Sequence, residues 1–408
     1  MIYNMITTEK AFNLIKKNIN KNLKISKVTL KNSLGRFLAE DIKSNINIPP
    51  QNNSAVDGFA INYSQKKNNS NLNYKIISEI NAGDVFKKKI EKNQCVKVST
   101  GSHLPYYLDT VIMLEDIKYI NNNFIELPKI LSTKKNVRKK GEDIKKGKII
   151  IAKKSILRSQ EIGLLASINK LEIKVFKKIK VAIISNGNEL VNPGINKKNN
   201  QIYDSNRFML MSLLKIPCIN VTDCGILKDD YDKIKEKILK LKNKYDLIVM
   251  SGGASVGHKD YVVKIIKKIG KLVFSSLAIK PGRPMSFGIL DNEVPILILP
   301  GNPVASFVTF NLFGNFLINC MHGLISKQPN FFLVKSNFNM IKKLGREEFL
   351  RGKLIRKNNE LFVIKYSTEG AGILSSVVWS DGLIKLNSDV NKIKINDYLQ
   401  FYPYDIFK

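Results

Sequence analysis

The sequence predicts an α/β and β multidomain protein, in which a parallel, doubly wound α/β domain lies between an N-terminal helical and β region and a small C-terminal β domain. Two patterns support this prediction. Between residues 179 and 327, short apolar runs alternate with helical patterns, as expected for strands buried in a parallel sheet with helices on both faces. On either side, β-like runs are separated by Gly, Asn and Pro clusters, which is typical of small β modules.

The chain length limits the number of domains. A chain of 408 residues holds two to four domains, because domains mostly have about 100 to 200 residues. Changes in pattern place an N-terminal region at residues 1–178, with an inserted β-rich module at about 54–140. The α/β domain is expected at residues 179–327 and the C-terminal β domain at 328–408.

A helix is predicted near the N-terminus, capped by Thr7 or Thr8, whose hydroxyl can accept a hydrogen bond from the first turn. Its apolar residues, at helical spacing, are Ala11, Leu14, Ile15 and Ile19. From about Ile25 to Leu131 the chain changes to β-like runs, and a short helical pattern returns near Ser159 to Ile168.

Three apolar runs are predicted as strands of the α/β domain: Val181 to Ile184, Leu247 to Met250 and Val294 to Leu299. Helical patterns lie between and after them, as in Tyr231 to Leu241 and Val304 to Leu317. In an open parallel sheet, ligands bind beyond the carboxyl ends of the strands. The loops that follow the three runs are therefore predicted to share one site.

The loop Ser251-Gly-Gly-Ala-Ser-Val-Gly257 can turn its backbone N–H groups toward an anion, because glycine has no Cβ in the way. We predict phosphate contacts from Gly252, Gly253, Ser255 and Gly257. An ordinary strand-to-helix turn is the alternative, since a single Gly-rich turn is a weak signal.

Two proline loops, Lys280-Pro-Gly-Arg-Pro284 and Pro300-Gly-Asn-Pro303, are predicted to form a rigid wall. Lys280 and Arg283 add cations suited to phosphate. Strand termination is the alternative for each loop by itself. The residues assigned to substrate binding here are Lys280, Gly282, Arg283, Pro300, Gly301, Asn302 and Pro303.

Acidic residues are informative because the chain has only 34 Asp and Glu against 67 Lys and Arg. Several could together hold Mg²⁺ through oxygen ligands and neutralise phosphate charge, although each alone is more often a helix cap or turn residue. They are Asp57, Asp143, Glu189, Asp229, Asp230 and Asp260.

The net charge of +33 attracts polyanions. Lysine is spread over nearly every segment without interleaved aromatic residues, so no specific nucleic-acid site is predicted. The four cysteines and three histidines show no metal-ligand spacing, which argues against a zinc site or a disulfide framework. Neither a targeting segment nor a membrane span is predicted, and a soluble cytoplasmic protein is expected.

At these motifs the chain resembles the MoeA molybdenumtransferases, whose domain also forms the C-terminal part of gephyrin. The resemblance runs nearly from end to end. It rests on Asn53-Ser-Ala-Val-Asp-Gly-Phe-Ala, Ser99-Thr-Gly-Ser, Asp109-Thr-Val-Ile-Met-Leu-Glu115, Gly141-Glu-Asp, Asn188-Glu-Leu-Val, Gln201-Ile-Tyr-Asp-Ser-Asn206, Lys228-Asp-Asp, Asp260-Tyr and the three loops named above.

The resemblance implies an elongated homodimer with four domains per chain, in which residues 1–178 supply dimerisation and linker segments. The implied reaction inserts molybdate into the dithiolene of adenylated molybdopterin, with Mg²⁺-assisted release of AMP. The implied catalytic residues are Asp57, Thr100 and Asp143 from one subunit, and Glu189, Asp229 and Asp260 from its partner. Glu189, Asp229 and Asp260 would hold the metal, with Lys280, Pro300 and Pro303 beside them in an intersubunit cleft.

The same resemblance allows contacts with the molybdopterin adenylyltransferase and with molybdoenzyme chaperones, and implies neither a specific nucleic acid nor a membrane as partner. The chain departs from the family pattern at Asn186, where relatives usually have threonine, and at Ser276, where they often have a basic residue. Arg283 replaces the commoner lysine, and Ser375 to Gly382 strays from the usual pattern. The alternatives are a gephyrin-like scaffold without turnover and non-specific nucleic-acid binding.

Overall fold

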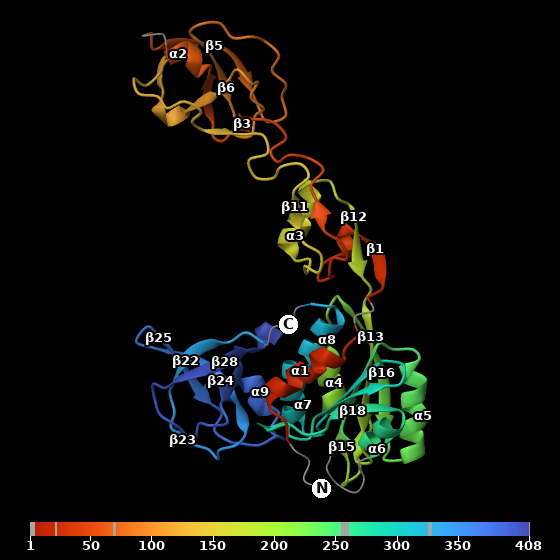
Figure 1. Cartoon of the computed structure of the whole chain (residues 1–408). Helices are drawn as coiled ribbons and strands as arrows, with labels where there is room; N and C mark the ends of the chain where they lie inside the picture. Colours follow the sequence, from red (N-terminus) through yellow and green to blue (C-terminus); the bar gives the residue numbers. More distant parts are fainter. Residues whose placement is uncertain (1–4, 21–22, 68–70, 254–260, 325–328, 408) are drawn as a thin grey trace. The chain divides into compact units, whose positions relative to one another are not determined.

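The structure is a computed structural model that describes residues 5–20, 23–67, 71–253, 261–324 and 329–407 (Figure 1). By their contacts the residues form two units. The larger unit consists of Met1–Ala39, Ile156–Arg158 and Glu172–Lys408, and the smaller of Glu40–Ser155 and Ser159–Leu171. The predicted domain boundaries at residues 178 and 327 stay predictions.

The centre of the larger unit is a six-stranded sheet with the order β16-β13-β17-β21-β20-β18. Its strands are β13 (Ile179–Asn186), β16 (Ile219–Leu227), β17 (Leu247–Ser251), β18 (Gly270–Phe274), β20 (Ser286–Leu290) and β21 (Pro295–Leu299). The first four strands in this order pair in parallel, whereas β20 and β18 add an antiparallel edge. The predicted α/β domain is confirmed, with an antiparallel edge that the sequence patterns did not indicate.

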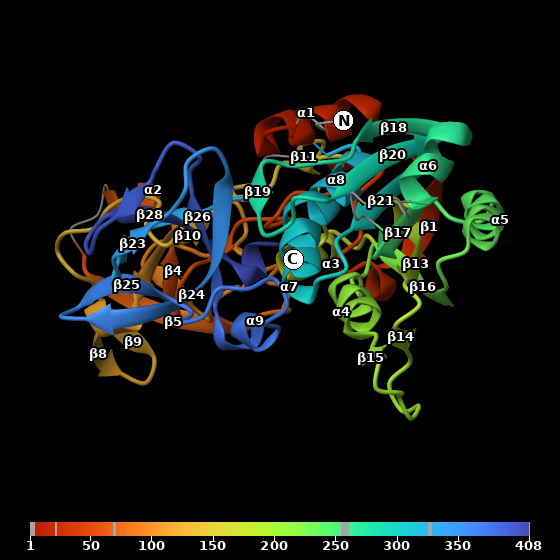
Figure 2. The ribbon, with the colours of Figure 1, turned by 90° about the horizontal axis from the view of Figure 1, so that it is seen from below.

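Helices cover both faces of this sheet (Figure 2). One face carries α1 (Thr8–Asn18), α4 (Ser205–Leu213), α7 (Pro303–Thr309) and α8 (Asn315–Met321), with the π-helical turn η3 (Phe310–Gly314) between the last two. The other face carries α5 (Tyr231–Lys242) and α6 (Tyr261–Lys268). This two-sided cover is the doubly wound arrangement expected from the sequence.

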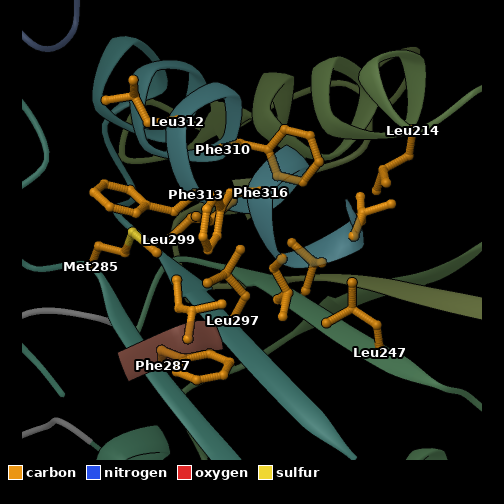
Figure 3. Close-up of a cluster of buried hydrophobic side chains, with 14 of the residues drawn as sticks. Leu214, Leu247, Met285, Phe287, Leu297, Leu299, Phe310, Leu312, Phe313 and Phe316 are labelled. Carbon is orange, nitrogen blue, oxygen red and sulfur yellow. The ribbon is translucent and has the colours of Figure 1, made fainter. Parts of the chain in front are cut away.

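Alternation along each strand divides the core into two layers. Val181 and Ile183 of β13 pack with the α1, α4 and α8 side, whereas Ala182 and Ile184 pack with α5 and α6. Figure 3 shows part of the first layer, where Leu247, Leu297 and Leu299 meet Phe310, Phe313 and Phe316. Both faces of the strands are buried, which explains why their sequences are continuous apolar runs.

The predicted N-terminal helix is confirmed. Thr7 caps α1, because its hydroxyl accepts a hydrogen bond from the backbone N–H of Lys10 at 3.2 Å. Ala11, Phe12 and Ile15 are buried, and the ring of Phe12 lies 4.8 Å from that of Phe313 between centroids. The apolar face of α1 thus completes the core over α8.

The helical segment Pro303–Met321 is long and apolar enough by composition to cross a membrane, with a mean hydropathy of 1.4. However, 83% of it is buried inside the protein, where it packs on the sheet. Its hydrophobicity is that of a core helix.

The C-terminal part of the larger unit is a small β domain. Its sheet has the order β19-β24-β25-β22-β28-β26, and β24 also pairs with β26, so five of the strands close into a ring. The strands are β19 (Ile279–Lys280), β22 (Phe332–Ser336), β24 (Glu347–Lys357), β25 (Glu360–Lys365), β26 (Gly382–Leu386) and β28 (Tyr398–Pro403). The other elements here are β23 (Met340–Ile341), β27 (Lys392–Ile393), α9 (Ser375–Trp379) and η4 (Tyr404–Phe407). β19 belongs to the Lys280 loop, so the pairing of β19 with β24 joins that loop to the β domain.

The smaller unit contains a six-stranded sheet with the order β7-β4-β6-β5-β9-β8, as the β-like runs predicted. Its strands are β4 (Gly58–Ile61), β5 (Asn73–Ile80), β6 (Gln94–Val98), β7 (Thr110–Met113), β8 (Lys118–Asn121) and β9 (Phe124–Glu126). The unit also holds β2 (Ile42–Lys43), β3 (Asn53–Ser54), β10 (Val137–Arg138), β11 (Ile149–Ile151), α2 (Tyr63–Lys67), α3 (Ser159–Ser167) and η2 (Leu114–Asp116). In the larger unit, β1 (Ile25–Thr29), which leads into η1 (Leu30–Asn32), pairs with β12 (Glu172–Phe176).

His322, at the end of α8, is a buried histidine with 1% of its surface exposed. Its Nδ1 lies 3.0 Å from the carbonyl oxygen of Ile318, and its ring lies 4.6 Å from that of Phe37 between centroids. Burial lowers the pKa of His322 from 6.5 to about 4, because the charged imidazolium is poorly solvated there.

We predict that His322 makes the fold sensitive to acid. The unfolded chain binds the proton near pH 6.5 and the folded chain only near pH 4, so stability is full above pH 6.5 and falls as the pH drops toward 4. The loss amounts to about 3 kcal/mol. Urea unfolding of the parent and of His322→Gln at pH 7.5 and 4.5 measures it, and the variant should lose about 2 kcal/mol less over this interval. Equal losses in both proteins would contradict this prediction.

Candidate functional site

The carboxyl ends of the parallel strands open onto one cleft of about 850 Å³ in the larger unit. Its walls include the loops after β13, β16, β17 and β21 and the N-terminus of α4. Nine of the residues predicted from the sequence line it: Glu189, Asp229, Gly252, Gly253, Arg283, Pro300, Gly301, Asn302 and Pro303. The loops gather here because parallel strands end at the same edge of the sheet.

The Gly252-Gly253 turn can be built only with glycine. Gly252 has a φ of +87° and Gly253 of +71°, a region that residues with a Cβ rarely adopt. A Cβ on Gly252 would lie 2.2 Å from the carbonyl oxygen of Asn186, and one on Gly253 would lie 2.8 Å from Cγ2 of Val262. The turn therefore brings bare backbone to the cleft, as a phosphate cradle requires. Ser255 and Gly257 of the same prediction, and the predicted metal ligand Asp260, lie outside the described residues.

Asp229 is held by the loop that follows β13. Its Oδ1 accepts a hydrogen bond of 2.6 Å from Nδ2 of Asn186, and its Oδ2 a longer one of 3.4 Å from the backbone N–H of Asn188. Its own backbone N–H donates to Oδ1 of Asn188 at 3.1 Å. The ends of β13 and β16 are thus joined through one carboxylate.

Glu189 lies exposed in the same cleft. Its carboxylate lies so close to Gly187 that a Cβ there would be 2.6 Å and 2.7 Å from the two carboxylate oxygens. The described residues contain no group of three His, Cys, Asp or Glu side chains that could hold a metal ion. The predicted third metal ligand, Asp260, is outside the described residues, so the magnesium set stays a prediction.

Asn206, on α4, connects two of the loops. Its Nδ2 donates to Oγ of Ser251 and to the carbonyl oxygen of Gly301, both at 2.7 Å. The sequence alone predicted no separate role for Asn206. The segment Gln201 to Asn206 was one of the motifs shared with the family, but an asparagine near the start of a helix is equally typical of a turn or a cap.

A buried ion-pair network supports α4 beneath the cleft. Asp204 caps the helix and accepts hydrogen bonds from Oγ of Ser185 at 2.9 Å and from Nε of Arg207 at 2.8 Å. Arg207 also pairs with Asp223 and contacts Asn192. Hydrogen bonds to Asp204 and Asp223 outweigh desolvation and raise the pKa of Arg207. The network fixes Asn206 next to the strand ends.

A second pocket of about 200 Å³ lies beside the first and shares Arg283, Pro284, Pro300 and Asn302 with it. Lys280 lines it and forms ion pairs with Glu348 at 3.3 Å and Glu369 at 2.9 Å. Although desolvation opposes the shift, these two carboxylates raise the pKa of Lys280. Gly282, also predicted from the sequence, lines this pocket.

Arg351, on β24, also lines the second pocket and is only 5% exposed. Its Nε donates to Oγ of Ser376 at 3.0 Å, and burial lowers its pKa. Among the described residues it has no carboxylate in an ion pair. Its Nη1 and Nη2 donate to the carbonyl oxygens of Phe349 and Gly370, both at 3.5 Å, so the pocket holds a largely desolvated cation whose hydrogen-bond partners are uncharged. Arg351 was not predicted from the sequence, because an arginine within a strand has no distinctive pattern around it.

Asp57 and Thr100 are brought together in the smaller unit. Oδ1 of Asp57 accepts hydrogen bonds from the backbone N–H of Thr100 at 2.7 Å and from its hydroxyl at 3.1 Å. The pair results from the antiparallel register of β4 and β6, in which Gly58 faces Val98. Asp143 lies exposed in another loop of the same unit, where its backbone N–H donates to the carbonyl oxygen of Ile48 at 3.0 Å.

Comparisons with known proteins cover nearly the whole chain. Three family models match in order: the MoeA N-terminal region (domain I and II) at residues 6–169, a probable molybdopterin binding domain at 182–319 and the MoeA C-terminal region (domain IV) at 334–404.

Individual relatives agree with these models. A molybdopterin molybdenumtransferase of Haemophilus influenzae is 32% identical over 93% of this chain and 93% of its own length. One from Staphylococcus epidermidis is 30% identical over 91% of this chain and 87% of its own. The crystal structure of a molybdopterin biosynthesis MoeA protein from Pyrococcus horikoshii OT3 has a TM-score of 0.84 at 29% identity, covering 98% of this chain and all of the other.

Proposed function

The chain belongs to the MoeA family, and from this premise we propose that it is a molybdopterin molybdenumtransferase, a transferase of molybdenum cofactor biosynthesis. The proposed reaction inserts molybdate into the dithiolene of adenylated molybdopterin and releases AMP. The observation that supports it most strongly is the cleft at the strand ends, where a bare glycine turn and two carboxylates line the same space.

The larger cleft suits a nucleotide-linked pyrophosphate. The N–H of Gly252 donates to the carbonyl oxygen of Leu299 at 3.1 Å, so the phosphate contact is assigned to the N–H of Gly253. The Pro300 to Pro303 loop lies beside this turn, since a Cβ on Gly301 would be 3.9 Å from Cα of Gly252. Asn206 connects this loop to the end of β17. These contacts hold the substrate in a fixed position relative to the acidic side chains, which favours reaction over binding alone.

Mg²⁺ fits the donors that line this cleft. Asp229 and Glu189 supply carboxylate oxygens. Such hard oxygen ligands suit Mg²⁺. When bound, the ion would neutralise charge on the phosphate groups. Glu189, Asp229 and Asp260 are the proposed residues around it.

The second pocket suits molybdate. The anion is small and doubly charged. The pocket has a small volume and an excess of positive charge, with Lys280, Arg283, Arg346 and Arg351 against Glu348 and Glu369. Because it shares Arg283 and Pro300 with the larger cleft, an anion there lies close to a substrate in the cleft. This arrangement supports delivery of molybdate to the dithiolene end of the substrate.

We further propose a cytoplasmic homodimer, in which Asp57, Thr100 and Asp143 of one subunit complete the cleft of its partner. The Asp57–Thr100 pair supports this part, since an exposed carboxylate held by a backbone N–H and a hydroxyl is already oriented for a ligand. The molybdopterin adenylyltransferase and molybdoenzyme chaperones are the proposed protein partners, with no specific nucleic acid and no membrane.

The central test is AMP release from adenylated molybdopterin with molybdate and Mg²⁺. Asp229→Asn should lower the single-turnover rate about 10- to 100-fold, because the amide keeps the shape and removes the charge. Substrate binding without Mg²⁺ should change little. Asp230→Asn is the matched control, because Asp230 caps α5 and pairs with Lys233 but is not among the residues that line the cleft, and asparagine also caps helices well. Substrate binding without molybdate-dependent AMP release in the parent protein would defeat the proposal.

The molybdate pocket is tested with Arg351→Gln, which removes the buried cation. The KM for molybdate should rise at least about tenfold, the effect of losing a charged hydrogen bond, while ADP affinity stays unchanged. Lys353→Gln removes the same charge from an exposed position of the same strand and should leave this KM unchanged. A similar KM in all three proteins would exclude this pocket as the molybdate site.

The shared cleft is tested by mixing two impaired variants, Asp57→Ala and Asp229→Asn. In a symmetric dimer, each mixed dimer has one cleft with both wild-type residues, so random exchange restores about a quarter of the sites. AMP release should recover to about that fraction only after subunit exchange. No recovery in a mixture shown to contain mixed dimers would place all these residues in the cleft of a single chain.

A further inference from the structure

Asn186 is the last residue of β13 and lies at the floor of the larger cleft, with 6% of its surface exposed. It contacts the ends of two neighbouring strands. Its Nδ2 donates to Oδ1 of Asp229 at 2.6 Å, and its carbonyl oxygen lies 2.2 Å from the position that a Cβ on Gly252 would take. Asn186 thus lies between the proposed metal carboxylate and the proposed phosphate turn.

The orientation of the Asn186 amide is fixed by its partner. An ionised carboxylate only accepts hydrogen bonds, so the NH₂ group must face Asp229 and Oδ1 must point away from it. This Oδ1 is buried and has no hydrogen-bond partner among the described residues. A buried acceptor without a partner destabilises the folded protein, because it has lost its hydrogen bonds to water. Such groups in folded proteins call for an explanation, and a functional role is one of them.

The chemistry of an amide suits this position. A lysine or arginine would also orient Asp229, but it would neutralise the negative charge that a cation needs. A threonine hydroxyl is one bond shorter than the carboxamide and lacks the reach. The carboxamide holds Oδ1 of Asp229 without changing its charge, while Oδ2 receives only the long 3.4 Å hydrogen bond from Asn188.

We propose that Asn186 is a positioning residue for the divalent cation: it occupies one oxygen of Asp229 and leaves the other directed to the ion. This inference rests on the proposed function only in placing a Mg²⁺-bound pyrophosphate in the cleft. Asn186 acts through Asp229 and does not itself react.

A double-mutant cycle tests this role, with ADP as the probe because ADP carries an adenosine and a pyrophosphate. Calorimetry measures ADP affinity with and without Mg²⁺ for the parent, Asn186→Ala, Asp229→Asn and the double variant. Asn186→Ala should weaken Mg²⁺-dependent binding about five- to tenfold, as second-sphere changes do. It should change metal-free binding by less than about twofold, and it should have no further effect when Asp229 is already asparagine.

Asn243→Ala is the matched control, because it removes the same side chain from the exposed C-terminal end of α5. It should leave both affinities unchanged, and thermal melting of every variant shows that the fold persists. The inference is overturned if Asn186→Ala weakens metal-free binding as much as metal-dependent binding. It is also overturned if the loss is the same with and without the Asp229 carboxylate.

Failure of this inference is distinguishable from failure of the proposed function, because ADP binding requires neither molybdate nor turnover. Coupling between Asn186 and Asp229 in a protein that never releases AMP would leave the inference standing and defeat the function. Normal AMP release without coupling would overturn the inference alone.

Discussion

The candidate site depends on the parallel pairing of four strands in one sheet. Because β16, β13, β17 and β21 run in the same direction, their carboxyl ends share one edge. Residues far apart in the sequence, such as Asn186 and Gly301, therefore line the same cleft. The strands hold this register because both of their faces are buried under helices, so any shift would expose apolar side chains.

Within this frame, a few polar side chains set the position of the loops. Asn186 ties the end of β13 to Asp229, and Asn206 ties Ser251 to Gly301. Asp204 and Arg207 hold α4 below them through a buried ion pair. A buried ion pair contributes little net stability, because desolvation offsets the attraction. The ion pair between Asp204 and Arg207 instead fixes the position of α4 relative to the strand ends.

Features that depend on local sequence patterns could be predicted from the sequence alone. Continuous apolar runs predicted buried strands, and the paired glycines predicted a turn that no other residue could form. The antiparallel edge of β20 and β18 was not predictable in this way, because an apolar run does not show the direction of its strand. Asn186 and Asn206 were likewise missed as structural links, since an asparagine acquires its role from the groups that folding places around it. The Asp57–Thr100 pair needed the register of β4 and β6, which the sequence pattern alone does not fix.

The two neighbouring pockets have opposite electrostatic character, and this difference matches the two proposed substrates. The larger cleft presents the Gly252-Gly253 turn together with Glu189, Asp229 and Arg283, so a cation held by the two carboxylates strengthens the binding of an anion there. The second pocket is lined by four cations, Lys280, Arg283, Arg346 and Arg351, against the two carboxylates of Glu348 and Glu369, and this excess of positive charge attracts a bare anion. A metal-bound pyrophosphate would therefore bind in the larger cleft and a free oxyanion in the second pocket. The two would then lie next to each other at the wall of Arg283 and Pro300 that the pockets share. The overall charge of +33 adds general attraction for both substrates, but it cannot distinguish between them. That distinction depends on the few carboxylates within the two pockets.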